Sequence, residues 1–120
     1  MNKVILQGRL TDDVKAEQTK KSTYANFTLA VRDRAVDEDG NPKAQFIRCV
    51  AFEKSAEILE EYTSKGSPLL ISGRLNNYQY EDEDGNTKYG YNVVVEEFDL
   101  IGSSNKEEKK DTKKSNKYHK

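Results

Sequence analysis

The chain has 120 residues, enough for one small domain with a modest core, and hydrophobic and charged residues each make up 34% of it. Apolar runs fall short of the roughly 20 residues that cross a bilayer, which excludes a membrane span, and the single cysteine, Cys49, excludes an internal disulfide framework. The net charge is −1, but residues 103–120 hold seven lysines against three acids, so residues 1–102 carry 13 basic and 18 acidic side chains.

The first half of the chain predicts three strands. Residues 4–10 alternate in polarity, with Val4, Leu6, Gly8 and Leu10 on one face. The pattern starts directly after the first three residues, so we expect no signal peptide and a cytoplasmic protein. A polar connection over residues 11–23 leads to a second strand over residues 24–32. The Gly-Asn-Pro turn of residues 37–42 then leads to a third strand over residues 45–53.

The second half predicts a helix, two strands and a tail. Apolar residues recur at helical spacing over residues 54–65, and Gly66 is a suitable stop. Strands over residues 69–80 and 87–101 flank an acidic turn, which lacks the spacing of an EF-hand, so we expect no metal site. From Ser103 onward the apolar periodicity is lost. Residues 103–120 are therefore predicted to be a disordered lysine-rich tail.

Three strands, a helix and two strands is the element order of an OB fold. We therefore predict an all-β protein whose residues 1–102 form a five-stranded barrel with one helix between the third and fourth strands. The repeat of Gly8-Arg9-Leu10 in Gly73-Arg74-Leu75 supports a closed sheet, because a glycine inside a strand is typical of a sharp bend. A chance repeat of three residues is the alternative.

The third predicted strand has two contrasting faces. Ile47, Cys49 and Ala51 are small and apolar, as the interior of a barrel requires. The other parity carries Phe46, Arg48, Val50, Phe52 and Lys54. If these side chains faced the core, two charges would be buried without partners. If they face solvent, they offer rings that stack on bases and cations that contact the phosphates between the bases.

The fourth predicted strand repeats the arrangement. Ile71, Gly73 and Leu75 share the inward parity, while the outward parity carries Arg74, Asn76, Tyr78 and Tyr80. Tyrosine suits an exposed stacking position because its ring is apolar and its hydroxyl can stay hydrated. The alternative for each ring is packing beneath a loop or at a subunit contact. The acids, including Glu96 and Glu97, are expected to form a solvated surface.

Several segments together resemble the bacterial and phage single-stranded DNA-binding protein family. They are residues 2–11 (NKVILQGRLT), 25–31 (ANFTLAV), 46–57 (FIRCVAFEKSAE), 65–67 (KGS) and 71–75 (ISGRL). The resemblance covers residues 2–101 in order. It implies an OB fold, homo-oligomers (a tetramer first, a dimer second), and single-stranded DNA as the partner in replication, recombination and repair. Proteins of replication or recombination would be further partners.

The resemblance also implies roles for individual residues. By position, Phe46, Phe52 and Tyr80 would stack on bases, and Arg48, Lys54 and Lys65 would contact the backbone. The chain departs from the family's pattern in three ways. The first is Ala35, which stands where an aromatic residue is common. The second is that Phe46 and Tyr80 stand where tryptophan is common.

The third departure is the end of the sequence. The family typically finishes in an acidic tip closing on Phe, which recruits partners, whereas this chain finishes Lys117-Tyr118-His119-Lys120. We therefore do not expect recruitment through such a tip. Coding by a phage or mobile element becomes the expectation, with the host cytoplasm as the compartment.

An enzyme is not expected, because the residue types for catalysis are missing or badly placed. His119 lies in the predicted tail, where nothing would hold it in a catalytic pose, and Cys49 has the inward parity of its strand. Phosphate-binding loops and zinc spacings are absent from the sequence, so we expect no cofactor. The remaining alternatives are an OB-fold module that binds RNA or one that mainly binds protein in replication.

Overall fold

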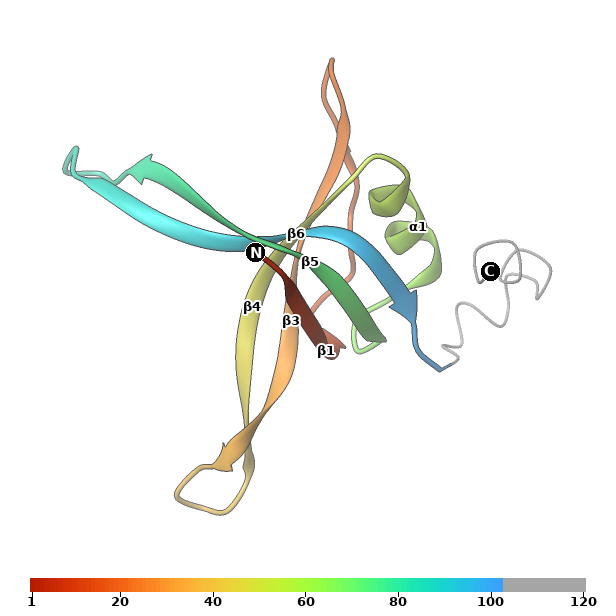
Figure 1. The fold of residues 1–120 in the computed structure, drawn as a ribbon, viewed down its shortest axis with the longest axis vertical. Helices are drawn as coiled ribbons and strands as arrows, with labels where there is room; N and C mark the ends of the chain where they lie inside the picture. The colour runs from red at the N-terminus through yellow and green to blue at the C-terminus, as the bar shows by residue number, and fades with distance from the viewer. Residues whose placement is uncertain (103–120) are drawn as a thin grey trace.

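The computed structural model describes residues 1–102 (Figure 1). These residues contain six strands and one helix. They are β1 (Val4–Leu10), β2 (Glu17–Gln18), β3 (Thr23–Val36), β4 (Pro42–Phe52), α1 (Lys54–Tyr62), β5 (Pro68–Glu81) and β6 (Thr87–Leu100). Five strands pair in the order β1-β5-β6-β4-β3, and pairing of β1 with β3 closes the ring. The prediction of an all-β OB-fold barrel, with its helix between the third and fourth long strands of the ring, is confirmed. The predicted tail, residues 103–120, lies outside the described residues.

One parity of each barrel strand faces the core, as the alternating pattern predicts. Phe27 and Leu29 of β3 and Cys49 and Ala51 of β4 are buried, while their sequence neighbours in the middle of each strand face outward or are only half-buried, apart from Val50. Ala56 and Leu59 of α1 pack into the same cluster. The core is completed by Leu10, Val14, Ala25, Leu69, Ile71, Val93 and Val95.

Two glycines lie where strands come close together. A Cβ on Gly8 would lie 2.3 Å from the carbonyl oxygen of Ala30, where β1 leaves β5 and joins β3. A Cβ on Gly73 would lie 2.0 Å from the carbonyl oxygen of Val94. The repeated Gly-Arg-Leu thus places glycine at two points of the barrel that no side chain could occupy.

Three hairpins project from the barrel in different directions (Figure 1). They join β2 to β3, β3 to β4, and β5 to β6. The tips of the last two have the same sequence, Asp-Glu-Asp-Gly-Asn, and the same hydrogen bonds: Oδ1 of Asp37 and of Asp82 each accepts two backbone N–H groups. Strands β3 and β4 run several residues further toward their own tip, at residues 37–41, than predicted, because the ladder pairing of β3 with β4 continues beyond the end of the apolar core.

The helix and the first connection also differ from the prediction. The helix ends at Tyr62 and not at residue 65, because Thr63 has extended backbone (φ −126°, ψ 165°). Gly66 takes its positive φ of 89° in the turn that follows, not at the cap. The predicted polar connection over residues 11–23 contains the short strand β2, which pairs with the start of β3. Within the described residues, α1 is too short and too polar to span a membrane.

Candidate nucleic-acid interface

Four of the eight predicted site residues line two adjoining hollows on the outward side of the barrel. One hollow, of about 530 Å³, is lined by Arg48 and Tyr78 together with Asn26, Thr28 and Asn92. The other, of about 420 Å³, shares Arg48, Tyr78 and Asn92, and adds Phe46, Tyr80 and Tyr91. Strands β3, β4, β5 and β6 all contribute to this surface. We call it the outer face, defined by Asn26, Thr28, Phe46, Arg48, Tyr78, Tyr80 and Asn92.

Tyr78 occupies the centre of the outer face, and three neighbours hold it. Its hydroxyl accepts a hydrogen bond from Nη1 of Arg48 at 3.4 Å. Its ring lies against Gly90 of β6, where an added Cβ would be 2.4 Å from the ring carbon Cζ. The Tyr80 ring is 6.2 Å away, centroid to centroid, and tilted by 39°. Gly90 therefore lets a ring from one strand lie across its neighbour.

Three of the predicted stacking rings are exposed. The exposed fraction is 66% for Phe46, 51% for Tyr80 and 45% for Phe52. Exposed rings beside a guanidinium provide apolar faces and positive charge together, which is what bases and phosphates require. The predicted outward parity of Phe46, Arg48 and Phe52 is therefore confirmed.

Two side chains depart from the predicted faces. Val50 has the outward parity but is buried, because it lies at the seam between β4 and β6, beside Val94. Leu75 has the inward parity but is exposed, because β5 runs past the end of the core at this point. Parity alone therefore does not give burial at the seam or in the projecting hairpin.

Phe52 and Lys54 lie at the other end of β4, outside both hollows. Glu53, between them, has a left-handed backbone (φ 53°) and is tied to Thr23 in both directions. Its N–H donates to the Thr23 carbonyl at 2.7 Å, and its Oε1 accepts from the Thr23 N–H at 3.1 Å. This exchange holds the sharp turn from β4 into α1, so Phe52 ends the strand and Lys54 begins the helix.

Lys65 and Arg74 are also separate from the hollows. Lys65 lies in the connection between α1 and β5, where its N–H donates to Oδ1 of Asp13 at 2.8 Å. Arg74 lies on β5 with the outward parity of Tyr78, and its Nη1 is 3.3 Å from Oε2 of Glu96. The prediction that the acids form only a solvated surface was therefore incomplete at Glu96.

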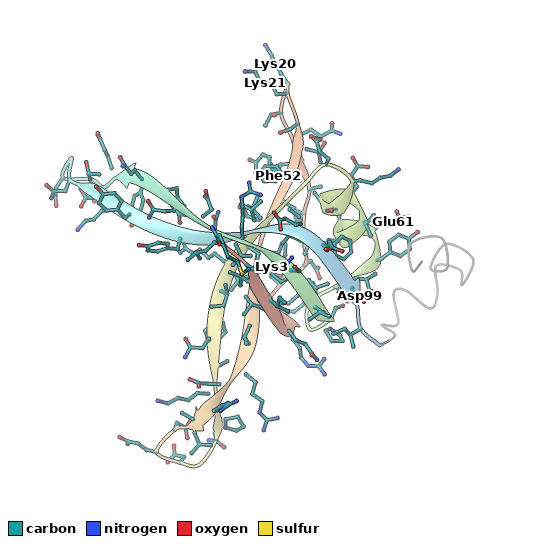
Figure 2. All side chains as sticks on the ribbon, viewed as in Figure 1. Lys3, Lys20, Lys21, Phe52, Glu61 and Asp99 are labelled. Atoms are coloured by element: carbon teal, nitrogen blue, oxygen red, sulfur yellow. The ribbon has the colours of Figure 1, made fainter. Side chains whose placement is uncertain are left out.

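Sequence reasoning missed two lysines outside the hollows and several residues that line them. Lys20 and Lys21 fall in what was predicted to be a plain connection, but Figure 2 shows them at the tip of the β2–β3 hairpin. That hairpin extends from the end of the barrel where Tyr24 pairs with Phe52. Asn26 and Thr28 could have been found from the outward parity of their strand. Tyr91 could not, because its parity places it on the opposite face of the β5–β6 hairpin.

Cys49 is a core residue, as its parity predicts. Burial raises the pKa of its thiol to about 12, so the thiolate that reacts as a nucleophile is disfavoured. Across residues 1–102, no group of three or more His, Cys, Asp or Glu side chains converges in a way that could hold a metal ion.

Known proteins of similar sequence indicate the family of this chain. Residues 1–101 match the model of the single-strand binding protein family. The chain is 44% identical over 107 residues to a single-stranded DNA-binding protein of Clostridium perfringens, covering 88% of this chain and 69% of the relative. It is 40% identical over 102 residues to single-stranded DNA-binding protein 1 of Streptococcus pyogenes, covering 84% and 78%. The chain therefore belongs to the single-strand binding protein family.

Proposed function

We propose that this protein binds single-stranded DNA on the outer face, without sequence preference. The observation that carries the proposal is the meeting of Phe46, Arg48, Tyr78 and Tyr80 around shared hollows. The names of its relatives, which describe single-stranded DNA-binding proteins, support the same function. Phe52, Lys54, Lys65 and Arg74 would extend the contacts beyond the hollows.

Stacking explains why binding would tolerate any sequence. Every base has a π-face, so stacking on a ring such as Tyr80 contributes about 1–3 kcal/mol of binding free energy per base, whichever base it is. Two side-chain amides that could read base edges are partly engaged with each other: Nδ2 of Asn76 donates to Oδ1 of Asn92 at 3.1 Å. A duplex keeps its base faces covered, so exposed rings favour single strands over duplex.

Homo-oligomers, a tetramer first and a dimer second, form part of the proposal. Support comes from the modest core of residues 1–102, and from Ile5 of β1, whose side chain is exposed on the outside of the barrel. Light scattering at micromolar concentration is expected to give a mass of four or two chains. A mass of one chain would contradict this part of the proposal.

The binding proposal is tested by competition between oligo-dT, oligo-U and duplex DNA for a labelled oligo-dT. We expect oligo-dT to compete at the lowest concentration and duplex DNA to compete weakly. Preference for oligo-U would favour the RNA-binding alternative, since a 2′-hydroxyl contact distinguishes the two strands. Failure of the labelled oligo-dT to bind would favour the protein-interaction module. Roles in replication, recombination and repair remain predictions.

A further inference from the structure

Strand β6 carries a β-bulge at Glu96. Ser72 of β5 lies opposite Glu97 and Gly73 lies opposite Val95, so Glu96 has no partner on β5. The bulge reverses the alternation of β6: Val93 and Val95 face the core before it, and Phe98 and Leu100 pack against the core after it. Glu96 and Glu97 are therefore both exposed.

The bulge brings Glu96 to Arg74. Gly73 allows β5 and β6 to approach here, since an added Cβ would meet the Val94 carbonyl. Arg74 follows directly and lies opposite Val94, on the same side of β5 as Tyr78. Its Nη1 is 3.3 Å from Oε2 of Glu96, and both side chains remain about half exposed, at 51% and 44%. A phosphate from solvent could reach the same guanidinium.

Carboxylate and phosphate compete for one guanidinium, because its planar N–H groups match both anions. We propose that Glu96 weakens the binding of single-stranded DNA by occupying Arg74, so that a phosphate gains this cation only by displacing the carboxylate. The inference rests on the proposed function. Glu96 would lower the affinity for the strand, so that the strand can dissociate. Arg74 would contact a phosphate only after Glu96 has moved away.

The test compares Glu96→Gln with Glu97→Gln, which changes the net charge equally but lies opposite Ser72, one residue from the bulge. Oligo-dT binding to the full chain is titrated against salt for each variant. Glu96→Gln is expected to tighten binding about two- to fivefold at low salt, the range that corresponds to an exposed ion pair. The slope of log K against log[salt] should also steepen by about 0.7, the value for one more phosphate contact. Glu97→Gln should leave the slope unchanged.

A double-mutant cycle separates occupation of Arg74 from general charge. Arg74→Gln should weaken binding more in the Glu96→Gln chain, where it should abolish the gain, than in the wild-type chain, where the carboxylate already occupies the guanidinium. Equal effects of Glu96→Gln and Glu97→Gln, or of Arg74→Gln in both backgrounds, would overturn the inference while leaving the proposed function intact. A wild-type chain that does not bind oligo-dT would overturn the proposed function and this inference with it. Thermal melting of each variant checks that the bulge still folds.

Discussion

Phe27 and Phe46 lie on neighbouring strands of one barrel, yet their surroundings are opposite. Phe27 is 7% exposed and belongs to the core cluster, whereas Phe46 is 66% exposed. A ring that stays exposed on folding adds little to the stability of the fold, because little of its apolar surface leaves water. It is available to stack on a base, as the proposed function requires.

Alanine substitutions should therefore separate binding from stability. Phe52→Ala and Tyr80→Ala are each expected to weaken oligo-dT binding by about 1–3 kcal/mol, the value of one stacking ring. Phe27→Ala should lower the free energy of unfolding by about 3–5 kcal/mol, because it leaves a core cavity. Fluorescence titration and thermal melting measure the two effects. Similar melting losses for all three variants, with unchanged affinity, would contradict the assignment of faces.

Cys49 gives a prediction about pH. Desolvation raises the pKa of its thiol to about 12 in the folded chain, above its usual value of 9.0. The unfolded chain therefore loses the thiol proton first, and the stability from this group, intact below pH 9, is lost as the pH rises toward 12. Iodoacetamide at about pH 8 should leave Cys49 unmodified in the native protein and alkylate it in urea, as mass spectrometry would show. Rapid native alkylation would mean that Cys49 is not buried.

Single residues were predictable where one strand decides their position. The alternation of residues 46–49 along β4 is sufficient to place Phe46, Arg48 and Cys49 on the correct faces. It could not give the burial of Val50, which depends on the neighbouring strand β6, nor the pairing of Arg74 with Glu96, which depends on a bulge. Cross-strand neighbours and bulges are set by register, which one strand's pattern does not contain.

The hairpins extend the barrel far beyond its core. Turn chemistry predicted the tips of the β3–β4 and β5–β6 hairpins correctly, because Gly40 and Gly85 supply the positive φ that such turns need. The β2–β3 hairpin was missed because β2 has only two residues and no apolar alternation. Its tip carries two lysines where the other two tips are acidic.

The lysines of the β2–β3 hairpin are expected to contact phosphates. A chain with Lys20→Gln and Lys21→Gln should bind oligo-dT with a salt slope shallower by about 1.4, at about 0.7 per lost contact. Lys3→Gln with Lys43→Gln removes the same charge elsewhere on the molecule and serves as the control. If both double variants change the slope equally, the lysines of the hairpin act only through net charge.

For the whole molecule, charge is divided along the chain. Residues 1–102 have an excess of five acids, and residues 103–120 have an excess of four lysines, counting Lys, Arg, Asp and Glu. A basic segment attached to an acidic domain can add phosphate contacts, maintain solubility, or bind the acidic surface of its own chain. These possibilities differ in how binding depends on salt.

Truncation after Gly102 distinguishes these roles of the basic segment. We expect the shortened chain to retain oligo-dT binding through residues 1–102, with a shallower salt slope and lower affinity at low salt. Salt titrations of both chains provide the measurement. An unchanged slope would indicate a role in solubility, and a gain in affinity would indicate that the lysines compete with DNA for the chain's own surface.

Bases are proposed to lie on the outer face, and photocrosslinking of 5-bromouracil-substituted oligo-dT identifies the residues that they touch. The β5–β6 hairpin supplies an internal control: Tyr78 and Tyr80 lie opposite Gly90 and Lys88 on one face, while Tyr89, 61% exposed, is on the other. Peptide mapping by mass spectrometry is expected to place crosslinks at Phe46, Tyr78 or Tyr80. An excess of unsubstituted oligo-dT should prevent these crosslinks by competition. Crosslinks concentrated at Tyr89, with none at those three rings, would show that the bases lie on the opposite face of the hairpin and not on the outer face.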